Sequence, residues 1–268
     1  MKADILDIRD LNFAYQSREI LREISLSLKQ GEFLGFLGPN GSGKSTFLKN
    51  LLGFLKPSGG RILYAGTNTV PSGKERSRLF SFVPQNTGLR SSFAVQDVIL
   101  MGRLPHLKDR WAGYSAKDRE KAREVMKVLG LESMADRNAM SLSGGELQKV
   151  IIARCLVQEG DIILLDEATS GLDLNHSIEI MELMRKKTAE ESKTVVAALH
   201  DLNLASQYCD RIVLLKEGRI RYQGSPREIL TSEVLEDVYG IQAMVGLDVY
   251  GRPFVLPRRA SGTHTGVS

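Results

Sequence analysis

The sequence predicts an α/β fold in which a mostly parallel sheet is flanked by helices. An apolar run at residues 33–37 leads into the glycine-rich segment GPNGSGKST, and leucines and a phenylalanine then recur at helical spacing to residue 55. Apolar runs return in DIILLDE (161–167), TVVAALH (194–200) and RIVLLKEG (211–218). The helix-like run LNHSIEIMELMRKK separates the first two of these. Strands that alternate with helices are typical of a covered parallel sheet.

The remaining elements follow in chain order. Residues 4–35 alternate short apolar stretches around a glycine turn and predict strands, as do RILYAG (61–66) and LFSFVPQ (79–85). VQDVILMG and KDREKAREVMKVLG carry helical periodicity, which indicates an inserted α-helical subdomain. After Gly224 the sequence predicts two short helices and a loose tail. We therefore expect a core at 1–86 and 158–224, a helical subdomain at 87–157 and a C-terminal extension at 225–268.

Composition excludes several classes of protein. The chain has 268 residues, of which 42% are hydrophobic and 25% charged, as in compact globular proteins. It contains no apolar run of about 20 residues and no signal-peptide pattern, so we expect a cytosolic chain with at most a peripheral membrane role. A net charge of +4 does not show whether the chain binds a nucleotide, a nucleic acid or a membrane surface. Cys155 and Cys209 lack metal-ligand spacing and are expected to be buried free thiols.

The segment GPNGSGKS fits the phosphate-binding P-loop pattern GxxxxGK[ST]. Its glycines let successive backbone N–H groups turn toward a phosphate, the lysine neutralises the outer phosphates, and the serine hydroxyl ligates Mg²⁺. The flanking strand and amphipathic helix supply the context that this motif requires. The predicted ATP-binding residues are Gly38, Asn40, Gly41, Ser42, Gly43, Lys44, Ser45 and Thr46.

Polar residues end several of the predicted strands. Asp166 and Glu167 follow four apolar residues, and ligands of an open parallel sheet bind beyond the carboxyl ends of its strands. We expect Asp166 to coordinate Mg²⁺ and Glu167 to polarise the attacking water. Gln85 and His200 end strands in the same way, although each of them also fits an ordinary loop residue. Tyr15 fits either a core aromatic residue or a platform that stacks on a base.

The stretch SLSGGELQ predicts a second anion-binding helix start. Ser143 is a good N-cap and Glu146 completes a capping box, so Gly144 and Gly145 leave the positive end of the helix open. The residues alone leave open whether this site faces the same phosphates as the P-loop.

These motifs, in their order, resemble those of the ATP-binding cassette (ABC) ATPases. The order is Tyr15, the P-loop, Gln85, LSGGE (142–146), Asp166-Glu167, SGLD (170–173) and His200. The resemblance implies an N-terminal antiparallel β subdomain and a head-to-tail homodimer. Each ATP would lie between the P-loop of one chain and the signature residues Ser143, Gly144, Gly145 and Glu146 of the other. It also implies that Tyr15 stacks on adenine and that Ser45, Gln85 and Asp166 hold Mg²⁺. Glu167 would be the general base and His200 would contact the γ-phosphate. Asp173 would act across the dimer.

Three further segments look like one branch of this family. MGRLPH (101–106), HDLNLASQYCDRIVLLKEGRI (200–220) and GSPREILTSEVLEDVYGI (224–241) are similar to the cassettes of iron-siderophore, haem and cobalamin importers. That resemblance implies a membrane permease dimer as partner, an extracytoplasmic solute-binding protein, a location on the cytoplasmic face of the cell membrane, and no nucleic acid. Two alternatives stay open, namely import of molybdate or a divalent metal, and a soluble ATPase that acts on nucleic acid or ribosomes.

Overall fold

The computed structural model describes residues 4–64, 71–85, 88, 92–107, 109 and 113–258. Its centre is a six-stranded sheet in the order β5-β6-β7-β3-β8-β9. All neighbouring strands are parallel except β8 and β9, so the prediction of a mostly parallel sheet is confirmed. The strands are β3 (Phe33–Leu37), β5 (Phe80–Val83), β6 (Ile162–Asp166), β7 (Thr194–Ala198), β8 (Arg211–Lys216) and β9 (Arg219–Gly224).

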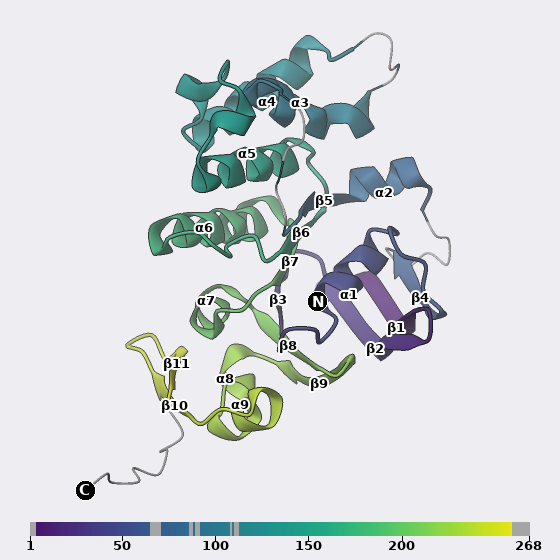
Figure 1. Ribbon diagram of the computed structural model, residues 1–268, viewed down its shortest axis with the longest axis vertical. Coiled ribbons are helices and arrows are strands. Elements are labelled where there is room, and N and C mark those ends of the chain that lie inside the picture. The colour runs from purple at the N-terminus through teal and green to yellow at the C-terminus, as the bar shows by residue number, and fades with distance from the viewer. Residues whose placement is uncertain are drawn as a thin grey trace, which may run out of the picture.

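A second, antiparallel sheet covers one face of the central sheet together with helix α1 (Lys44–Leu51). It has the order β2-β1-β4, with β1 at Asp4–Tyr15, β2 at Arg18–Lys29 and β4 at Gly59–Tyr64. Figure 1 shows this sheet and α1 on one side of the central strands and helices α6 and α7 on the other. The antiparallel β subdomain that the resemblance implied is therefore present.

The alternating direction of the side chains along the central strands explains why the sheet is covered on both faces. In β6, Ile162 and Leu164 pack into the core shared with α1 and the antiparallel sheet, whereas Ile163 and Leu165 pack into the core shared with the other helices. Successive strand residues point to opposite faces, so a strand that is apolar throughout needs a cover on both sides. Helices α6 (Leu174–Glu191) and α7 (Leu202–Tyr208) supply the second cover.

The helical segment forms a block at one end of the sheet (Figure 1). It contains α3 (Val95–Leu100), α4 (Ala116–Val128) and α5 (Gly144–Val157), and α2 (Gly73–Leu79) precedes β5. The buried Arg103 connects two helices of this block. Its Nε lies 2.8 Å from Asp118 Oδ1 at the start of α4, and its Nη1 donates to the carbonyl oxygen of Val157 at the end of α5. The boundaries of a separate subdomain at 87–157 stay a prediction.

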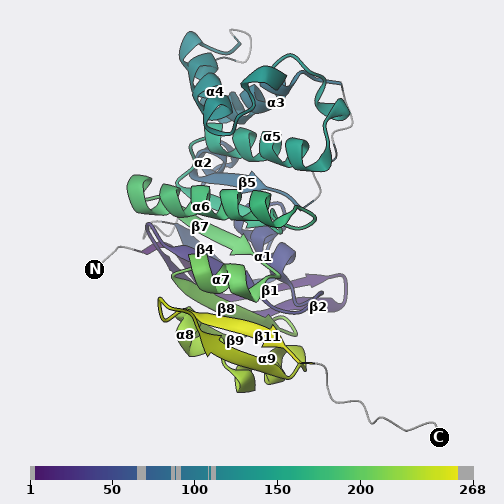
Figure 2. The same cartoon turned by 90° about the vertical axis from the view of Figure 1, so that its left-hand side faces the viewer.

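The C-terminal part holds more structure than the sequence indicated. Helices α8 (Pro226–Ile229) and α9 (Ser232–Tyr239) match the two predicted helices, and an unpredicted hairpin follows, formed by β10 (Ala243–Leu247) and β11 (Pro253–Pro257). Figure 2 shows this hairpin beside α7, where Asn203 binds the backbone of Val255. The predicted loose tail at 258–268 lies outside the described residues, apart from Arg258.

Two further expectations concern the whole chain. Cys155 and Cys209 are both buried free thiols, as predicted. Within the described ranges, the chain contains no helix whose length and apolar character would let it span a bilayer.

Candidate active site

The loop between β3 and α1 has a backbone that only glycine adopts easily. Gly38 and Gly43 have φ angles of +147° and +111°, where side chains are strained. A Cβ atom on Gly38 would lie 2.2 Å from the carbonyl oxygen of Leu215, and one on Gly43 would lie 2.8 Å from the Leu21 side chain. A Cβ on Gly41 would meet no atom within 4 Å, so this side of the loop is open. The glycines of the motif are therefore required by the geometry of the loop.

Lys44 is buried against this loop. Its Nζ donates hydrogen bonds to the carbonyl oxygens of Gly38 at 2.8 Å and Pro39 at 3.2 Å. Burial lowers the pKa of Lys44, and the carboxylates of Glu167 and Asp166 partly offset that effect. A buried cation that is held only by carbonyl oxygens and nearby carboxylates can exchange them for an anionic ligand.

Ser45 and Asp166 meet next to the lysine. The Ser45 hydroxyl donates a 2.8 Å hydrogen bond to Asp166 Oδ1, so the first turn of α1 contacts the end of β6. Burial raises the pKa of Asp166, although the hydrogen bond from Ser45 opposes the shift. A hydroxyl and a carboxylate are oxygen ligands of the kind that Mg²⁺ prefers, and a bound cation would offset the cost of burying the ionised Asp166.

Side chains that follow three neighbouring strands meet at Glu167. Gln85 Nε2 lies 2.5 Å from Glu167 Oε2, and His200 Nε2 lies 2.5 Å from Glu167 Oε1. The backbone N–H of Glu167 donates to Ala198 on β7, and its φ of +53° is unusual for a residue with a side chain. Such strained positions are concentrated at functional sites. The structure therefore gathers the three polar strand ends, Gln85, Glu167 and His200, around one carboxylate.

A cavity of about 300 Å³ opens above the loop. Its lining includes Glu167 from β6 together with P-loop residues and two residues of β2 that the sequence reasoning missed, Arg18 and Ile20. Beside it, the buried Ser42 hydroxyl has no hydrogen-bond partner among the described residues. The lining residues are Arg18, Ile20, Asn40, Gly41, Gly43, Lys44, Ser45, Thr46 and Glu167.

Tyr15 lies next to the turn of the hairpin formed by β1 and β2, opposite Arg18. The backbone of Tyr15 pairs with Arg18, and the residue is 46% exposed. Its one described ring contact is a T-shaped approach to Phe13, with 4.8 Å between the ring centroids. Tyr15 is therefore not a core aromatic residue. Nearly half of the residue is accessible to a ligand. No local sequence pattern pointed to Arg18, because its place at the cavity depends on the packing of β2 beside α1.

The signature segment lies away from this cavity in the single chain. The backbone N–H of Ser143 donates to the Glu146 carboxylate at 2.7 Å, and the backbone N–H of Glu146 donates to the Ser143 hydroxyl at 3.3 Å, which gives the predicted capping box at the start of α5. Ser143 and Gly144 are exposed, and none of the four signature residues lines the P-loop cavity. Asp173 is also exposed, and it caps α6 by accepting a hydrogen bond from the His176 backbone. One chain therefore does not bring these residues to its own P-loop.

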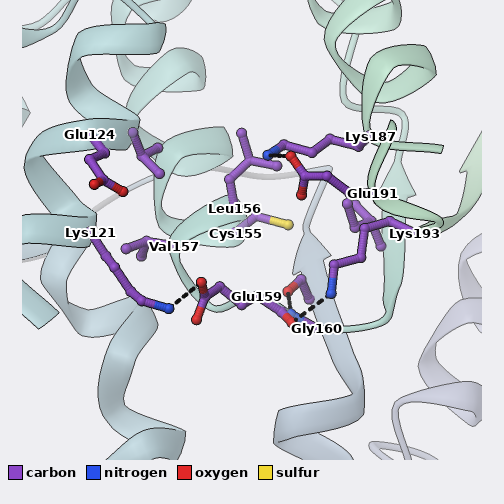
Figure 3. A pocket seen from close by; sticks show the side chains of 13 residues that line it. Lys121, Glu124, Cys155, Leu156, Val157, Glu159, Gly160, Lys187, Glu191 and Lys193 are labelled. Carbon is purple, nitrogen blue, oxygen red and sulfur yellow. Dashed lines mark hydrogen bonds and ion pairs between the residues drawn. The ribbon is translucent and has the colours of Figure 1, made fainter. Parts of the chain in front are cut away.

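Another cavity, of about 280 Å³, lies between the helical block and α6 (Figure 3). Its lysines are engaged by neighbouring groups: Lys121 by Glu159, Lys187 by Glu191 at 2.5 Å, and Lys193 by a backbone oxygen. Burial raises the pKa of the Cys155 thiol in its wall to about 12, so this thiol is a poor nucleophile at neutral pH. The cavity contains none of the predicted site residues.

Comparisons with known proteins identify the family of this chain. The family model described as ABC transporter matches residues 21–170. An uncharacterized ABC transporter ATP-binding protein of Methanocaldococcus jannaschii is 41% identical, over 96% of this chain and 99% of that protein. The ferric enterobactin transport ATP-binding protein of Escherichia coli is 36% identical over 92% of each chain, and the hemin import ATP-binding protein of Pseudomonas entomophila is 39% identical over 90% of this chain and 94% of that protein.

Solved structures share the same architecture. A protein described as a metal-chelate type ABC transporter, in an inward-facing conformation, superposes with a TM-score of 0.83 at 30% identity, over 96% of this chain and 98% of that one. An ATP-binding cassette in a dimeric post-hydrolysis state, bound to ADP and phosphate, superposes with a TM-score of 0.72 at 31% identity, over 82% of this chain and 98% of that one.

Proposed function

Because this chain belongs to the ABC transporter family, as an ATP-hydrolysing cassette, we propose that it energises the import of a metal chelate through a membrane permease. The chelate would be an iron-siderophore, haem or cobalamin. Relatives named for ferric enterobactin and hemin, together with the metal-chelate type transporter, support this substrate class.

The observation that carries the proposal is that the P-loop cavity and the signature residues lie apart in one chain. The P-loop cradle, the Ser45–Asp166 pair and Glu167 surround one cavity, whereas Ser143 and the open start of α5 face solvent elsewhere. A helix start that exposes its N–H groups attracts an anion. A second copy, arranged head to tail, would bring its Ser143, Gly144, Gly145, Glu146 and Asp173 to the ATP on the first.

The first chain would hold ATP by its phosphates and its base. Lys44 would exchange its contacts with Gly38 and Pro39 for the outer phosphates, and the ring of Tyr15 would stack on adenine. The backbone of residues 38–46 would bind the phosphate oxygens. Ser45, Asp166 and Gln85 would hold Mg²⁺, which when bound neutralises charge on the phosphate oxygens.

Glu167 would act as the general base. Both of its carboxylate oxygens are engaged here, one by Gln85 and one by His200. For catalysis, a water molecule would take the place of one of these contacts and give its proton to Glu167 as its oxygen attacks the γ-phosphorus. The bond between that phosphorus and the bridging oxygen would break, and ADP would leave. His200 would then contact the γ-phosphate.

ATP would act by shifting a two-state dimer. Two bound ATP molecules favour a closed dimer because only that dimer satisfies their contacts with Ser143, and hydrolysis removes this preference. The dimer would drive a permease dimer, fed by an extracytoplasmic solute-binding protein, from the cytoplasmic face of the membrane.

Affinity purification tests the proposal. The tagged chain, extracted with detergent from membranes of cells that produce it naturally, is expected to retain an integral membrane permease and to hydrolyse ATP. Recovery of the chain with ribosomes or nucleic acid, together with ATP hydrolysis that RNA or DNA stimulates, would overturn the importer assignment.

A further inference from the structure

Helix α9, in the C-terminal extension, is anchored to the end of β8. Lys216 Nζ donates to the backbone carbonyl of Asp237 and lies 3.2 Å from its Oδ1. Arg221 Nε and the Tyr222 hydroxyl, both on β9, donate to Asp237 Oδ2 at 2.9 and 3.1 Å. Helix α9 lies beside β9 in Figures 1 and 2. Asp237 therefore fixes the second half of this helix against the edge of the central sheet.

The end of β8 also lies against the first glycine of the P-loop. A Cβ atom on Gly38 would lie 2.2 Å from the carbonyl oxygen of Leu215, the residue before Lys216. Leu37, which precedes Gly38, is buried in the same core against which the ring of Tyr239 packs. The start of the P-loop and α9 therefore contact two consecutive residues of one strand and share one core.

The Tyr239 hydroxyl, at the end of α9, faces the backbone N–H of Gly38. The hydroxyl is buried, and within the described part of the chain it closes no hydrogen bond of ordinary geometry. Burial raises the pKa of Tyr239 to about 12, and the Gly38 N–H, which favours the ionised oxygen, offsets only part of that rise. The oxygen is therefore uncharged at neutral pH and points at a donor that it does not fully engage.

A second buried hydroxyl flanks the same glycine. Ser42 Oγ lies 2.9 Å from the position of a Cβ atom on Gly38, and it has no hydrogen-bond partner among the described residues. Buried polar atoms are nearly always paired, so two open hydroxyls beside one glycine indicate a second arrangement of the loop in which these groups are paired. In the present arrangement Lys44 occupies the Gly38 carbonyl at 2.8 Å. A phosphate that draws Lys44 away would release Gly38 to adopt the second arrangement.

We infer that Tyr239 is a positioning residue for the P-loop, and that its hydroxyl accepts a full hydrogen bond from the Gly38 N–H when ATP is bound. This contact holds the start of the loop while Lys44 leaves the carbonyls of Gly38 and Pro39 for the phosphates. Tyr239 does not line the nucleotide cavity, so it acts on ATP affinity through the loop and not on the chemical step. The inference rests on the proposed nucleotide site and is independent of the imported substrate.

ATP binding and turnover by full-length Tyr239→Phe test the inference. Phenylalanine keeps the ring in the core and removes only the hydroxyl, so the Kd and the KM for ATP should rise about 3- to 10-fold, the range expected for one neutral hydrogen bond. The kcat at saturating ATP should stay within about twofold of the wild type, because the contact stabilises the bound ground state and the transition state equally. Unchanged affinity would refute the role of Tyr239, whereas a wild-type chain that binds no ATP would refute the nucleotide site itself.

Tyr222→Phe is the matched control. It removes the same hydroxyl from β9, where that group donates to Asp237, and it leaves Asp237 held by Lys216 and Arg221. Its ATP affinity should equal that of the wild type. An equal loss of affinity in both variants would show that the anchoring of α9, and not the hydroxyl at Gly38, is responsible, and the inference would be wrong.

Hydrogen exchange of the Gly38 amide, followed by NMR on the ¹⁵N-labelled chain, measures the contact directly. The chain is saturated with a non-hydrolysable ATP analogue and Mg²⁺. Exchange of this amide should be about 3- to 10-fold slower in the wild type than in Tyr239→Phe, both at full saturation. Equal exchange in the two proteins would overturn the inference, whatever the stability of the variant.

Discussion

Gln85 and Glu167 are joined by a hydrogen bond of 2.5 Å, although 82 positions separate them in the chain. The contact links the residues that follow β5 and β6, two neighbouring parallel strands. His200, after β7, reaches the other oxygen of the same carboxylate. Glu167 is therefore oriented from both sides, at the edge of the cavity above the P-loop.

This arrangement predicts the effect of Glu167→Gln. The variant keeps the size of the side chain but removes its ability to accept a proton, so ATP turnover should fall about 10²- to 10⁴-fold while ATP binding is retained. Single-turnover hydrolysis and nucleotide binding measure the two effects. Glu190→Gln, at an exposed residue of α6, is the control and should hydrolyse ATP normally. A single-turnover rate near that of the wild type would reassign the base.

If each ATP is held between the P-loop of one chain and Ser143 of the other, Ser143→Arg should prevent ATP-dependent dimerisation. The arginine would fill the open start of α5, while the P-loop of the same chain keeps its ATP affinity. Sedimentation with ATP in a Glu167→Gln background measures the dimer.

Ser72→Arg is a matched control for Ser143→Arg. Ser72 and Glu75 form the same capping box at the start of α2, with hydrogen bonds of 2.8 and 3.3 Å, and Ser72 is exposed. Both substitutions remove an N-cap and should each cost about 1 kcal/mol of stability. Only the Ser143 variant should lose the dimer, and an equal loss in both would point to destabilisation instead.

The buried pair of Arg103 and Asp118 predicts a pH-dependent contribution to stability. Burial opposes ionisation of Asp118, but hydrogen bonds from Ser115 and Arg103 outweigh it and lower the pKa of Asp118 to about 2. A lowered pKa in the folded state stabilises the fold at neutral pH, and this contribution is lost as the pH falls from about 4 toward 2.

Asp118→Asn should therefore lower the free energy of unfolding by about 3 kcal/mol at pH 7. This loss of stability is at the low end of the range for breaking a buried ion pair, because Glu159 still contacts Arg103. Urea unfolding should give the same difference from the wild type at pH 7 and pH 5, and a smaller one below pH 4. Asp136→Asn, at an exposed residue, should change stability by less than about 0.5 kcal/mol. A difference that is constant down to pH 3 would contradict the assignment.

Patterns within one segment predicted most of the fold. The apolar run before Asp166 indicated a strand covered on both faces, and the S-x-x-E pattern at Ser143 indicated a capped helix start, and both are present. Gln85, Glu167 and His200 each follow a strand of the parallel sheet, and the three side chains meet at one edge of that sheet. These features depend on neighbours in the sequence or on one general property of sheets.

Features that depend on packing between distant segments could not be predicted in this way. The hairpin of β10 and β11 is short, and it is held by Asn203 and Ser206 of α7, which no local pattern connects to it. Arg18 and Ile20 reach the P-loop cavity because β2 lies beside α1.

Uptake of radiolabelled chelates tests the central claim most directly. Cells that lack the chain would be supplied with the wild type or with Glu167→Gln, and uptake of an iron-siderophore, haem and cobalamin would be measured beside molybdate and a free divalent metal. The account predicts that wild type restores uptake of at least one chelate, that Glu167→Gln does not, and that uptake of molybdate and the free metal is unaffected. Normal uptake of all three chelates without the chain, or a loss confined to molybdate or the free metal, would contradict it.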